Sequence, residues 1–458
     1  MRDFTDNSEF ETAHIFSLIL RLSDTIFMKN PFYCCCFLFL QIGMAQNDFT
    51  ETTPEVLGIS SERLEKISAM LQESVTEKQI PGAVALIARN GKIAYWKSFG
   101  QANASGKGLE RDAIFRIASQ TKAITATAVM ILWEEGKFQL DDPISKFIPE
   151  FSNSQLLESF DEEDSTFTTK PAGKEITIRH LLTHTSGLGY GMIDGDEQFR
   201  KIYSKAGVTD LFTTEKISIG ESVEKLAKLP LHHVPGEKWT YSEGLDVLGY
   251  FIEVVSGKAF DEFLKERIFE PLGMNDTYFY LPQEKAGRLV AVQEKVQGKW
   301  KNFGVTFYDP DYPKKGAKAF FSGGAGLSST ANDYARFLQM YLNEGSFNGK
   351  HILSPTTVRT IMSEQVTDLF GGPENFYGLA FGMINQKAVT KGGQGSAGTF
   401  DWGGYFNTQY FADPETNTIG ILMKQTQGDL NDETAWKFRQ MVFSSIMELE
   451  PEQPKNER

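Results

Sequence analysis

Ser119 and Lys122 stand three positions apart, directly before a long apolar segment that runs from Ala123 to Glu135. Residues i and i+3 lie on the same face of a helix, about 5–6 Å apart at Cβ. The lysine ammonium can therefore lie beside the serine hydroxyl and, with a further base, make it a nucleophile. The spacing predicts a nucleophilic pair at the head of a buried helix.

The same spacing occurs a second time, at Ser222 and Lys225. That copy lies in the charged segment SVEKLAKL, which is typical of an amphipathic surface helix. The segment after Ser119 is instead apolar on most faces, and burial of this kind favours the neutral amine. We therefore place the reactive pair at Ser119 and Lys122.

Tyr241 is the candidate for the further base. It follows a Pro-Gly turn in the segment HVPGEKWTYSE. A neighbouring lysine ammonium can hold a tyrosine as the phenolate, because the cation stabilises the anion. The phenolate could accept the Ser119 proton and later return it to the leaving group. A tyrosine after a turn is usually structural, but the presence of Ser119 and Lys122 favours the catalytic interpretation.

Trp402, Gly403 and Gly404 lie within a strand-like segment. Glycine inside a strand weakens it and often marks the close approach of a ligand or another backbone. A substrate against this strand would present its carbonyl to the backbone N–H groups of Ser119 and Tyr405. Each such donor stabilises a developing oxyanion by roughly 3–4 kcal/mol. A simple bulge or bend in the strand is the alternative.

Strand and helix patterns at both ends of the chain enclose a mainly helical block at about 114–269. The elements expected outside the block are a helix at 61–77, strands at 82–89 and 92–99, strand-like runs at 377–384, 399–412 and 417–424, and a helix at 432–448. Asn90-Gly91 between the first two strands is a strong signal for a two-residue hairpin. Within the block, 158–174 is expected to be a surface loop and 190–228 a lid or wall over the site. These patterns predict an α+β fold, an α/β sandwich with an antiparallel sheet and an inserted mainly helical region.

The first 45 residues differ from the rest of the chain. Met28 and Lys29 begin a short basic patch, an apolar run follows, and small residues three apart end at Ala45. This pattern predicts an N-terminal extension and a secretory signal peptide that is cleaved after Ala45, with Met28 as the true start. The apolar run, Phe32–Phe39, is shorter than the roughly 20 residues of a membrane span. An uncleaved anchor and ordinary N-terminal structure are the alternatives, and we expect an exported protein, periplasmic or secreted, with no membrane span in the mature chain.

Residues 46–450 are expected to form one domain, followed by a polar tail at 451–458. All three cysteines, Cys34 to Cys36, lie in the predicted signal, so the mature chain would have no disulfide, thiolate ligand or cysteine nucleophile. The net charge is −14 and no run of Lys or Arg stands out, so neither nucleic acid nor an anionic membrane is an expected partner. The six histidines form no H-E-x-x-H or H-x-H pattern, and we expect neither a metal nor an organic cofactor.

Several segments of the chain resemble those of serine β-lactamase-like hydrolases, the group that holds class C β-lactamases and D-alanyl-D-alanine peptidases. They are most similar to segments of family VIII carboxylesterases. The segments that carry the resemblance are FRIASQTKAITATAVMILWEEGK, IRHLLTHTSGLGY, HVPGEKWTYSEGLDVLGYFIEVVSG, IFEPLGMNDT, FSGGAGLSSTANDYARFLQMYL and TFDWGGYFNTQYFADPETNTIGIL. The resemblance implies a β-lactamase/transpeptidase-like fold. It also implies that Ser119 is the acylated nucleophile, Lys122 its activating partner and Tyr241 the general base.

Two residues depart from the β-lactamase pattern. Glu243 stands where the tyrosine motif of β-lactamases ends in asparagine; an ionised glutamate beside Lys122 would keep the lysine cationic, unless it points away. Trp402 stands where the lactamase strand carries Lys or His, and indole offers an apolar face and one N–H donor but no charge. Both departures favour neutral esters, so the expected partner is a small-molecule ester, with a short acyl group.

Two further residues have more than one interpretation. Trp239 can line the pocket or pack against the fold. His184, in the segment LLTHTSG, could be a triad base, although the matching family motif serves packing near the site. The alternative functions are a β-lactamase or D-alanyl-D-alanine carboxypeptidase, and a catalytically silent binding protein on the same fold, which Glu243 alone supports.

Overall fold

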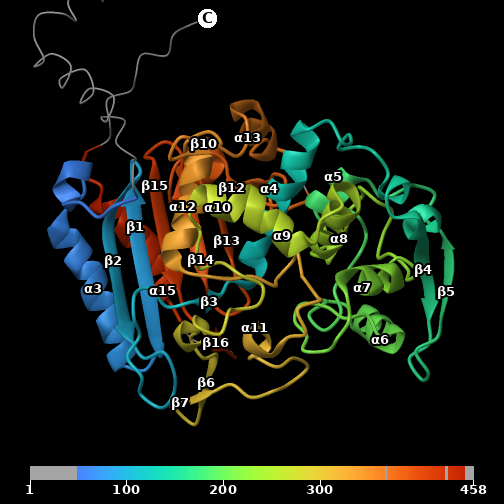
Figure 1. Ribbon diagram of the computed structural model, residues 1–458, viewed down its shortest axis with the longest axis horizontal. Coiled ribbons are helices and arrows are strands. Elements are labelled where there is room, and N and C mark those ends of the chain that lie inside the picture. The colour runs from blue at the N-terminus through green and yellow to red at the C-terminus, as the bar shows by residue number, and fades with distance from the viewer. Residues whose placement is uncertain (1–48, 367–368, 393, 429–431, 449–458) are drawn as a thin grey trace, which may run out of the picture. The chain divides into compact units, whose positions relative to one another are not determined.

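A computed structural model describes residues 49–366, 369–392, 394–428 and 432–448 (Figure 1). The predicted signal peptide and the predicted polar tail lie outside the described residues. The elements below belong to the unit that begins at Phe49.

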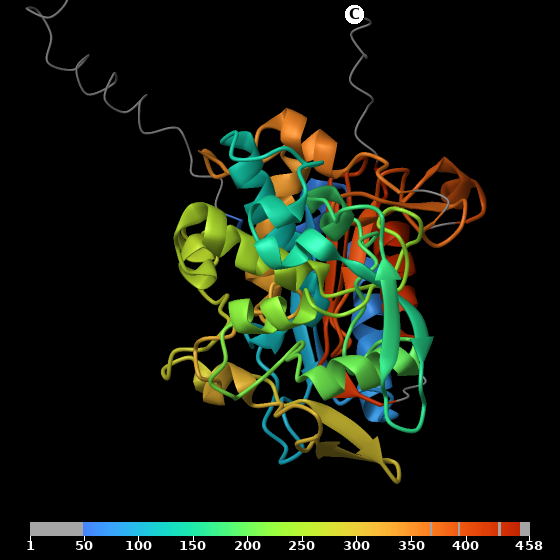
Figure 2. The ribbon, with the colours of Figure 1, turned by 90° about the vertical axis from the view of Figure 1, so that its right-hand side faces the viewer.

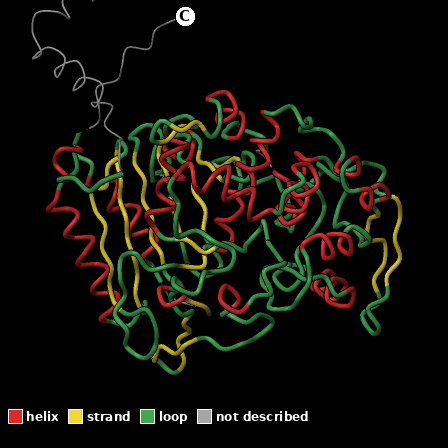
Figure 3. The backbone as a smooth tube through the Cα atoms, in the orientation of Figure 1, coloured by secondary structure: helices red, strands yellow, loops and turns green. Residues whose placement is uncertain are grey.

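This unit contains a seven-stranded sheet, which Figures 1 and 3 show in the left half of the view. Every neighbouring pair of its strands is antiparallel. Its strands, in spatial order, are β11 (Asn375–Tyr377), β12 (Gly382–Ile384), β13 (Phe400–Gly403), β14 (Gln409–Asp413), β15 (Thr418–Met423), β1 (Gly82–Arg89) and β2 (Lys92–Gly100). The predicted antiparallel sheet is therefore confirmed. The run expected at 399–412 consists of two strands, β13 and β14, because the chain turns back after Gly403.

The β1–β2 hairpin turns at Asn90-Gly91, as predicted. Both residues have positive φ, 51° and 72°, which is the conformation that a tight two-residue hairpin requires. All eight residues of β1 are buried because both faces of the sheet are covered. Alternate residues of β1 enter two different cores, Val84, Leu86 and Ala88 on one face and Ala83, Ala85 and Ile87 on the other.

Helices cover both faces of the sheet. On one face α3 (Ser61–Thr76) and α15 (Thr434–Ser445) lie side by side, and their apolar side chains share a core with β1 and β15. On the other face α12 (Ala331–Leu342) packs against β1 and β15. Fully burying one Leu, Ile or Phe side chain stabilises a fold by about 1.5–3 kcal/mol. The two cores therefore hold the sheet firmly between its helices.

The mainly helical region follows β2 in the chain, and Figure 2 shows its helices in front of the sheet. Its helices are α4 (Thr121–Glu134), α5 (Ile178–Leu182), α6 (Glu197–Ala206), α7 (Ile219–Leu226), α8 (Gly244–Ser256), α9 (Phe260–Leu264) and α10 (Glu270–Leu272). In α4 every residue from Thr121 to Leu132 is buried, as its apolar sequence predicts, and the helix packs against α8.

The segment 158–174, expected to be a loop, contributes to an exposed hairpin. Strand β4 (Gln155–Phe160) pairs with β5 (Phe167–Pro171), and the hydroxyl oxygens of Ser159 and Thr168 meet across the strands at 2.6 Å. All five residues of β5 are exposed, so its sequence carries no alternation of apolar and polar residues. The loop prediction failed because strand patterns are recognised by that alternation.

Short elements complete the fold. The paired strands are β3 (Phe115–Arg116) with β8 (Ser328–Ser329), β6 (Gln293–Val296) with both β7 (Lys299–Asn302) and β16 (Thr426–Gln427), and β9 (Ser346–Phe347) with β10 (Lys350–His351). The remaining α-helices of the described residues are α11 (Tyr312–Lys315), α13 (Pro355–Ile361) and α14 (Gln386–Thr390).

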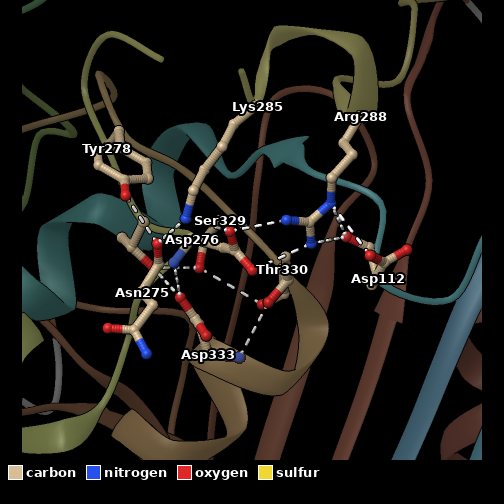
Figure 4. Close-up of polar contacts among 10 residues, drawn as sticks. Asp112, Asn275, Asp276, Tyr278, Lys285, Arg288, Ser329, Thr330 and Asp333 are labelled. Atoms are coloured by element: carbon tan, nitrogen blue, oxygen red, sulfur yellow. Dashed lines mark hydrogen bonds and ion pairs between the residues drawn. The ribbon is translucent and has the colours of Figure 1, made fainter. Parts of the chain in front are cut away.

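A polar network ties the loop after α10 to the start of α12 (Figure 4). The Asp276 carboxylate accepts hydrogen bonds from Lys285 Nζ at 2.7 Å and from Arg288 Nη1 at 2.8 Å. The Asp276 N–H in turn donates to the Asp333 carboxylate at 2.7 Å. The carboxylate of Asp276 thus binds the part of the loop that carries Lys285 and Arg288, and its backbone N–H binds Asp333 at the start of α12.

This loop also supports β3, the strand that leads to Ser119. The N–H of Ile114 donates to the carbonyl of Arg288 at 3.0 Å, and the N–H of Val290 donates to the carbonyl of Ile114 at 2.9 Å. The network around Asp276 therefore fixes the backbone just before the predicted nucleophile.

We expect Asp276→Asn to lower the free energy of unfolding at pH 7 by about 1–2 kcal/mol, because Arg288 and Lys285 lose a charged acceptor that is only partly screened. Burial would raise the pKa of Asp276, but the hydrogen bonds from Arg288 and Lys285 outweigh it and hold the pKa below its ordinary value. This stabilisation is present above the ordinary carboxyl pKa and is lost as the pH falls through the lowered value. Denaturant unfolding at pH 7 and pH 3 would measure it. Glu62→Gln, in an exposed pair with Lys66, is the control; an equal loss at both pH values would contradict the prediction.

Candidate active site

Ser119 lies in a tight 3₁₀ turn, Ala118–Gln120, between β3 and α4. Ala118 has a φ of 43°, a left-handed conformation that costs a non-glycine residue on the order of 1–3 kcal/mol. The side chain of Ala118 is fully buried, so the surrounding core holds this turn in place. Strain of this kind is concentrated at functional sites, and here it lies immediately before the predicted nucleophile.

Tyr241 lies directly against Ser119. Its hydroxyl donates to Ser119 Oγ at 2.7 Å, and both side chains are partly exposed, so a substrate can reach them. Lys122 Nζ lies 4.6 Å from the centre of the Tyr241 ring. The structure thus brings together the three residues that the sequence analysis selected, Ser119 from the 3₁₀ turn, Lys122 from α4 and Tyr241 from the segment before α8.

Lys122 is almost fully buried, with 1% of its surface exposed. Its Nζ donates to the Tyr190 hydroxyl and to the Gly324 carbonyl, both at 2.8 Å. Burial raises the pKa of Tyr190 well above its ordinary value, so Tyr190 is a neutral phenol that accepts this hydrogen bond. Sequence reasoning missed Tyr190 as a site residue, although its position between two glycines in the segment GLGYGM was a usable signal.

The backbone of the glycine segment comes very close to the strand before Ser119. A Cβ on Gly404 would lie 2.5 Å from the carbonyl oxygen of Ile117 and 2.2 Å from Thr408 Oγ1, so only glycine fits there. A Cβ on Gly403 would have no neighbour closer than 3.6 Å, and this position is open. The structure therefore places the end of β13, and Tyr405 after it, beside the turn that holds Ser119.

Aromatic rings form a wall next to Tyr241. The ring of Trp402 lies 6.2 Å from that of Tyr241 and 5.6 Å from that of Tyr377, and it covers Gly382 on the next strand. Trp239 stacks on the Tyr241 ring at 6.0 Å, so it belongs to this wall. We call this set the Trp402 wall; its members are Trp239, Tyr241, Phe370, Tyr377 and Trp402.

A second aromatic group contacts the side chain of Tyr405. The ring of Tyr405 lies 5.3 Å from Phe406, 6.3 Å from Tyr308 and 6.4 Å from Phe212. Phe212 comes from the segment 190–228, which the sequence analysis expected to form a wall. The Tyr405 carbonyl accepts a hydrogen bond from Gln427 at 2.9 Å, which fixes the backbone at that position.

His184 supports the tyrosine segment and does not contact Ser119. Its Nδ1 accepts a hydrogen bond from the Ser242 N–H at 3.2 Å, and its ring lies 4.8 Å from that of Tyr241. Burial, and to a lesser extent the Lys122 charge, keeps the pKa of His184 well below its ordinary value. A neutral, fully buried imidazole in this place fits packing better than a triad base.

Glu243 does not lie beside Lys122 as an ionised partner, so that expectation is wrong. Its side chain is buried, and burial together with the neighbouring Asp210 and Asp246 raises its pKa well above the ordinary value. The carboxyl points into an acidic group, and the alternative that it points away is the correct one. Asp246 is the carboxyl whose charge acts on Lys122.

The second copy of the spacing is structural. The Ser222 hydroxyl donates to the Thr209 carbonyl at 2.7 Å, and Lys225 Nζ donates to the Gly207 carbonyl at 3.1 Å. Lys225 is exposed, so this copy lacks the dry setting of Lys122.

Within the described ranges, no three His, Cys, Asp or Glu side chains are grouped so that they could hold a metal ion. A search of the same ranges finds no helix with the length and apolar character needed to cross a bilayer.

We expect Tyr190→Phe to lower kcat/KM for an ester substrate about tenfold, because Lys122 loses one of its two hydrogen-bond acceptors in a buried place. Tyr341→Phe is the matched control: Tyr341 is also buried and bonds to α4, at Thr127, but away from Ser119. Steady-state kinetics with thermal unfolding as a check on folding would measure both variants. A Tyr190→Phe enzyme with unchanged kcat/KM would contradict a role at the site.

The chain is similar to known proteins over most of its length. The family model described as Beta-lactamase matches residues 67–441. Protein Rv1367c of Mycobacterium tuberculosis is 32% identical over 387 residues, which covers 80% of this chain and 91% of that protein. Esterase EstB of Burkholderia gladioli is 29% identical over 374 residues, 79% of this chain and 90% of that protein. Among solved structures, "EstCE1, a hydrolase with promiscuous acyltransferase activity" has the same fold, with a TM-score of 0.70 and 24% identity over 84% of this chain and 98% of that one.

Proposed function

The chain belongs to the β-lactamase family, a family of serine hydrolases, and we propose that it cleaves carboxylic esters through an acyl-enzyme on Ser119. One observation carries the proposal: the Tyr241 hydroxyl lies 2.7 Å from Ser119 Oγ, with buried Lys122 against the Tyr241 ring. This is the distance at which a general base can take a proton from a nucleophile.

Acylation would use these groups as follows. Ser119 Oγ attacks the ester carbonyl while Tyr241, as phenolate, takes the hydroxyl proton. The N–H groups of Ser119 and Tyr405 stabilise the oxyanion. When the carbon–oxygen bond to the alcohol breaks, Tyr241 gives the proton to the departing oxygen. The alcohol leaves, and the acyl group stays on Ser119 as an ester.

Deacylation would reverse the same steps with water. Tyr241 takes a proton from a water molecule, and the resulting hydroxide attacks the acyl carbonyl. The bond to Ser119 Oγ breaks, Ser119 recovers the proton and the carboxylic acid leaves. The hydrogen bonds of Lys122 Nζ to Tyr190 and Gly324 would hold this group against the Tyr241 ring throughout.

The Trp402 wall supports esters over β-lactams and peptides. Recognition of a substrate carboxylate in this family's lactamases is expected to use a cation at the position that Trp402 occupies here. The indole packs on Tyr241 and Tyr377 and presents an apolar face. The resemblance to Esterase EstB points to the same substrate class.

We expect Ser119→Ala and Lys122→Ala each to lower kcat for p-nitrophenyl butyrate by at least about 10³-fold, because the nucleophile and the group that stabilises its base act as a unit. Lys225→Ala, in the second copy of the spacing, is the control and should retain activity. The wild type should turn over a chromogenic cephalosporin far more slowly than the ester. Rapid cephalosporin cleavage with negligible ester cleavage would favour the β-lactamase or peptidase alternative, and no Ser119-dependent fluorophosphonate adduct would favour the silent binding protein.

We also propose that the protein is exported and that its signal is cleaved after Ala45. The basic patch at Met28, the apolar run and the small residues before Gln46 support this. Intact mass and N-terminal sequencing of the protein from fractionated cells should show a mature chain that begins at Gln46 outside the cytoplasm. An N-terminus upstream of Phe32 in the exported fraction would contradict cleavage at this site.

A further inference from the structure

The turn Gly189–Met192, which carries Tyr190, is held by side chains along its whole length. Three of its four backbone N–H groups donate to a side-chain oxygen: Gly189 to the Tyr203 hydroxyl at 3.1 Å, Tyr190 to Asp194 Oδ2 at 2.7 Å and Met192 to Asp210 Oδ2 at 2.9 Å. The fourth, the Gly191 N–H, faces the carboxyl groups of Asp210 and Glu243 and acts to lower the pKa of both, against the larger effect of burial.

The two glycines of this turn are required by the same carboxyl groups. A Cβ on Gly189 would lie 2.2 Å from Asp194 Oδ2, and a Cβ on Gly191 would lie 2.6 Å from Asp210 Oδ2. A side chain at either position would have to displace one of these carboxyl groups. The acidic side chains therefore restrict both positions that flank Tyr190 to residues without a side chain.

Glu243 joins this turn to the segment that carries the predicted base. It lies two residues after Tyr241, and its backbone N–H donates to the Gly189 carbonyl at 3.0 Å. Its carboxyl faces the Gly191 N–H, on the other side of Tyr190. Glu243 thus binds the turn on both sides of the tyrosine whose hydroxyl accepts from Lys122.

The surroundings of the Glu243 carboxyl are acidic. The titratable groups that face it are Asp194, Asp210, Asp246, Tyr190 and Tyr203. Asp194 is in turn paired with His232, and Lys122 faces Asp246 and Tyr190. Glu243 is 3% exposed, and among the described residues its Oε1 has no hydrogen-bond partner. A buried carboxylate with acidic neighbours and no cation is costly, whereas a protonated carboxyl can share its proton with an adjacent carboxylate.

We propose that Glu243 works as a neutral carboxylic acid that fixes the Gly189–Met192 turn and thereby positions Tyr190 against Lys122. Glu243 is a positioning residue, since it acts on the reacting groups only through Tyr190 and Lys122. The role rests on the proposed Ser119 chemistry. It also explains how a glutamate is accommodated where the β-lactamase motif has a neutral asparagine: the two side chains are alike in charge.

Whether the Glu243 carboxyl is neutral or ionised decides which other side chain can take its place without loss of activity. Glutamine keeps a carbonyl oxygen for the Gly191 N–H and an N–H₂ group that can donate to Asp210. Leucine keeps the approximate volume and loses both hydrogen bonds. If Glu243 is neutral, glutamine replaces it and leucine does not.

The test compares Glu243→Gln and Glu243→Leu with Glu253→Gln as the control; Glu253 lies in α8, and burial also raises its pKa. With p-nitrophenyl butyrate, Glu243→Gln should keep kcat/KM within about threefold and keep the pH profile of the wild type. Glu243→Leu should lose at least about tenfold in kcat with little change in KM. Adding Tyr190→Phe to Glu243→Leu should cost little more, because both act through Lys122.

A direct measurement of protonation does not depend on turnover or on the leucine variant folding. The wild type should show a carboxylic-acid C=O band in the infrared at pH 8 that Glu243→Gln lacks. Burial raises the folded-state pKa of Glu243, so the stability that its protonated carboxyl contributes is lost as the pH rises. Glutamine does not titrate. The stability of Glu243→Gln relative to the wild type should therefore increase from pH 5 to pH 8.

Three results would overturn the proposal. The first is a Glu243→Gln enzyme that loses tenfold or more and has a shifted pH profile, as an ionised glutamate would require. The second is a folded Glu243→Leu enzyme with the kcat of the wild type, and the third is the absence of the infrared band. A wild type without Ser119-dependent ester turnover would instead refute the proposed function, which the same assays reveal separately.

Discussion

The site depends on the burial of one ammonium group. Removing a charged lysine from water costs several kcal/mol unless polar partners replace the water. Lys122 is 1% exposed, and its partners come from three distant parts of the chain: the Tyr190 hydroxyl, the Gly324 carbonyl and the face of the Tyr241 ring. The Asp246 carboxylate adds charge compensation from α8. Each of these groups has to be placed accurately, because an ammonium that lacks one of them inside the protein would destabilise the fold as well as the site.

Glycines and acids are what place these partners. A Cβ on Gly324 would lie 2.4 Å from Asp246 Oδ2, so only glycine lets its carbonyl reach Lys122 while the carboxylate lies behind it. Gly189 and Gly191, on either side of Tyr190, also have neighbours too close for a Cβ. Gly404 has such neighbours as well, between the end of β13 and the strand before Ser119. Backbone that approaches this closely cannot shift to accommodate a displaced side chain. The geometry around Ser119 is therefore set by close backbone contacts as much as by the catalytic side chains.

Much of this arrangement could be predicted because it is local in the sequence. The Ser119–Lys122 pair needs only the period of one helix, and the β1–β2 hairpin needs only Asn90-Gly91. Tyr190 escaped prediction because its role is created by a contact 68 positions away in the chain. The surroundings of Glu243 could not be predicted for the same reason: burial, Asp210 and Asp246 raise its pKa, and the fold alone brings these carboxyl groups together.

The nucleophilic pair by itself does not determine what the enzyme acts on. The proposed acyl-enzyme chemistry would use Ser119, Lys122 and Tyr241, and any ester, lactam or peptide carbonyl could take part in it. Discrimination must come from groups that contact the rest of the substrate, and here the Trp402 wall and the rings around Tyr405 are aromatic. Aromatic faces bind apolar groups and leave a carboxylate poorly solvated. The proposed preference for neutral esters would therefore come from these aromatic surfaces, while Lys122 and its partners would serve the chemistry of any of these carbonyls.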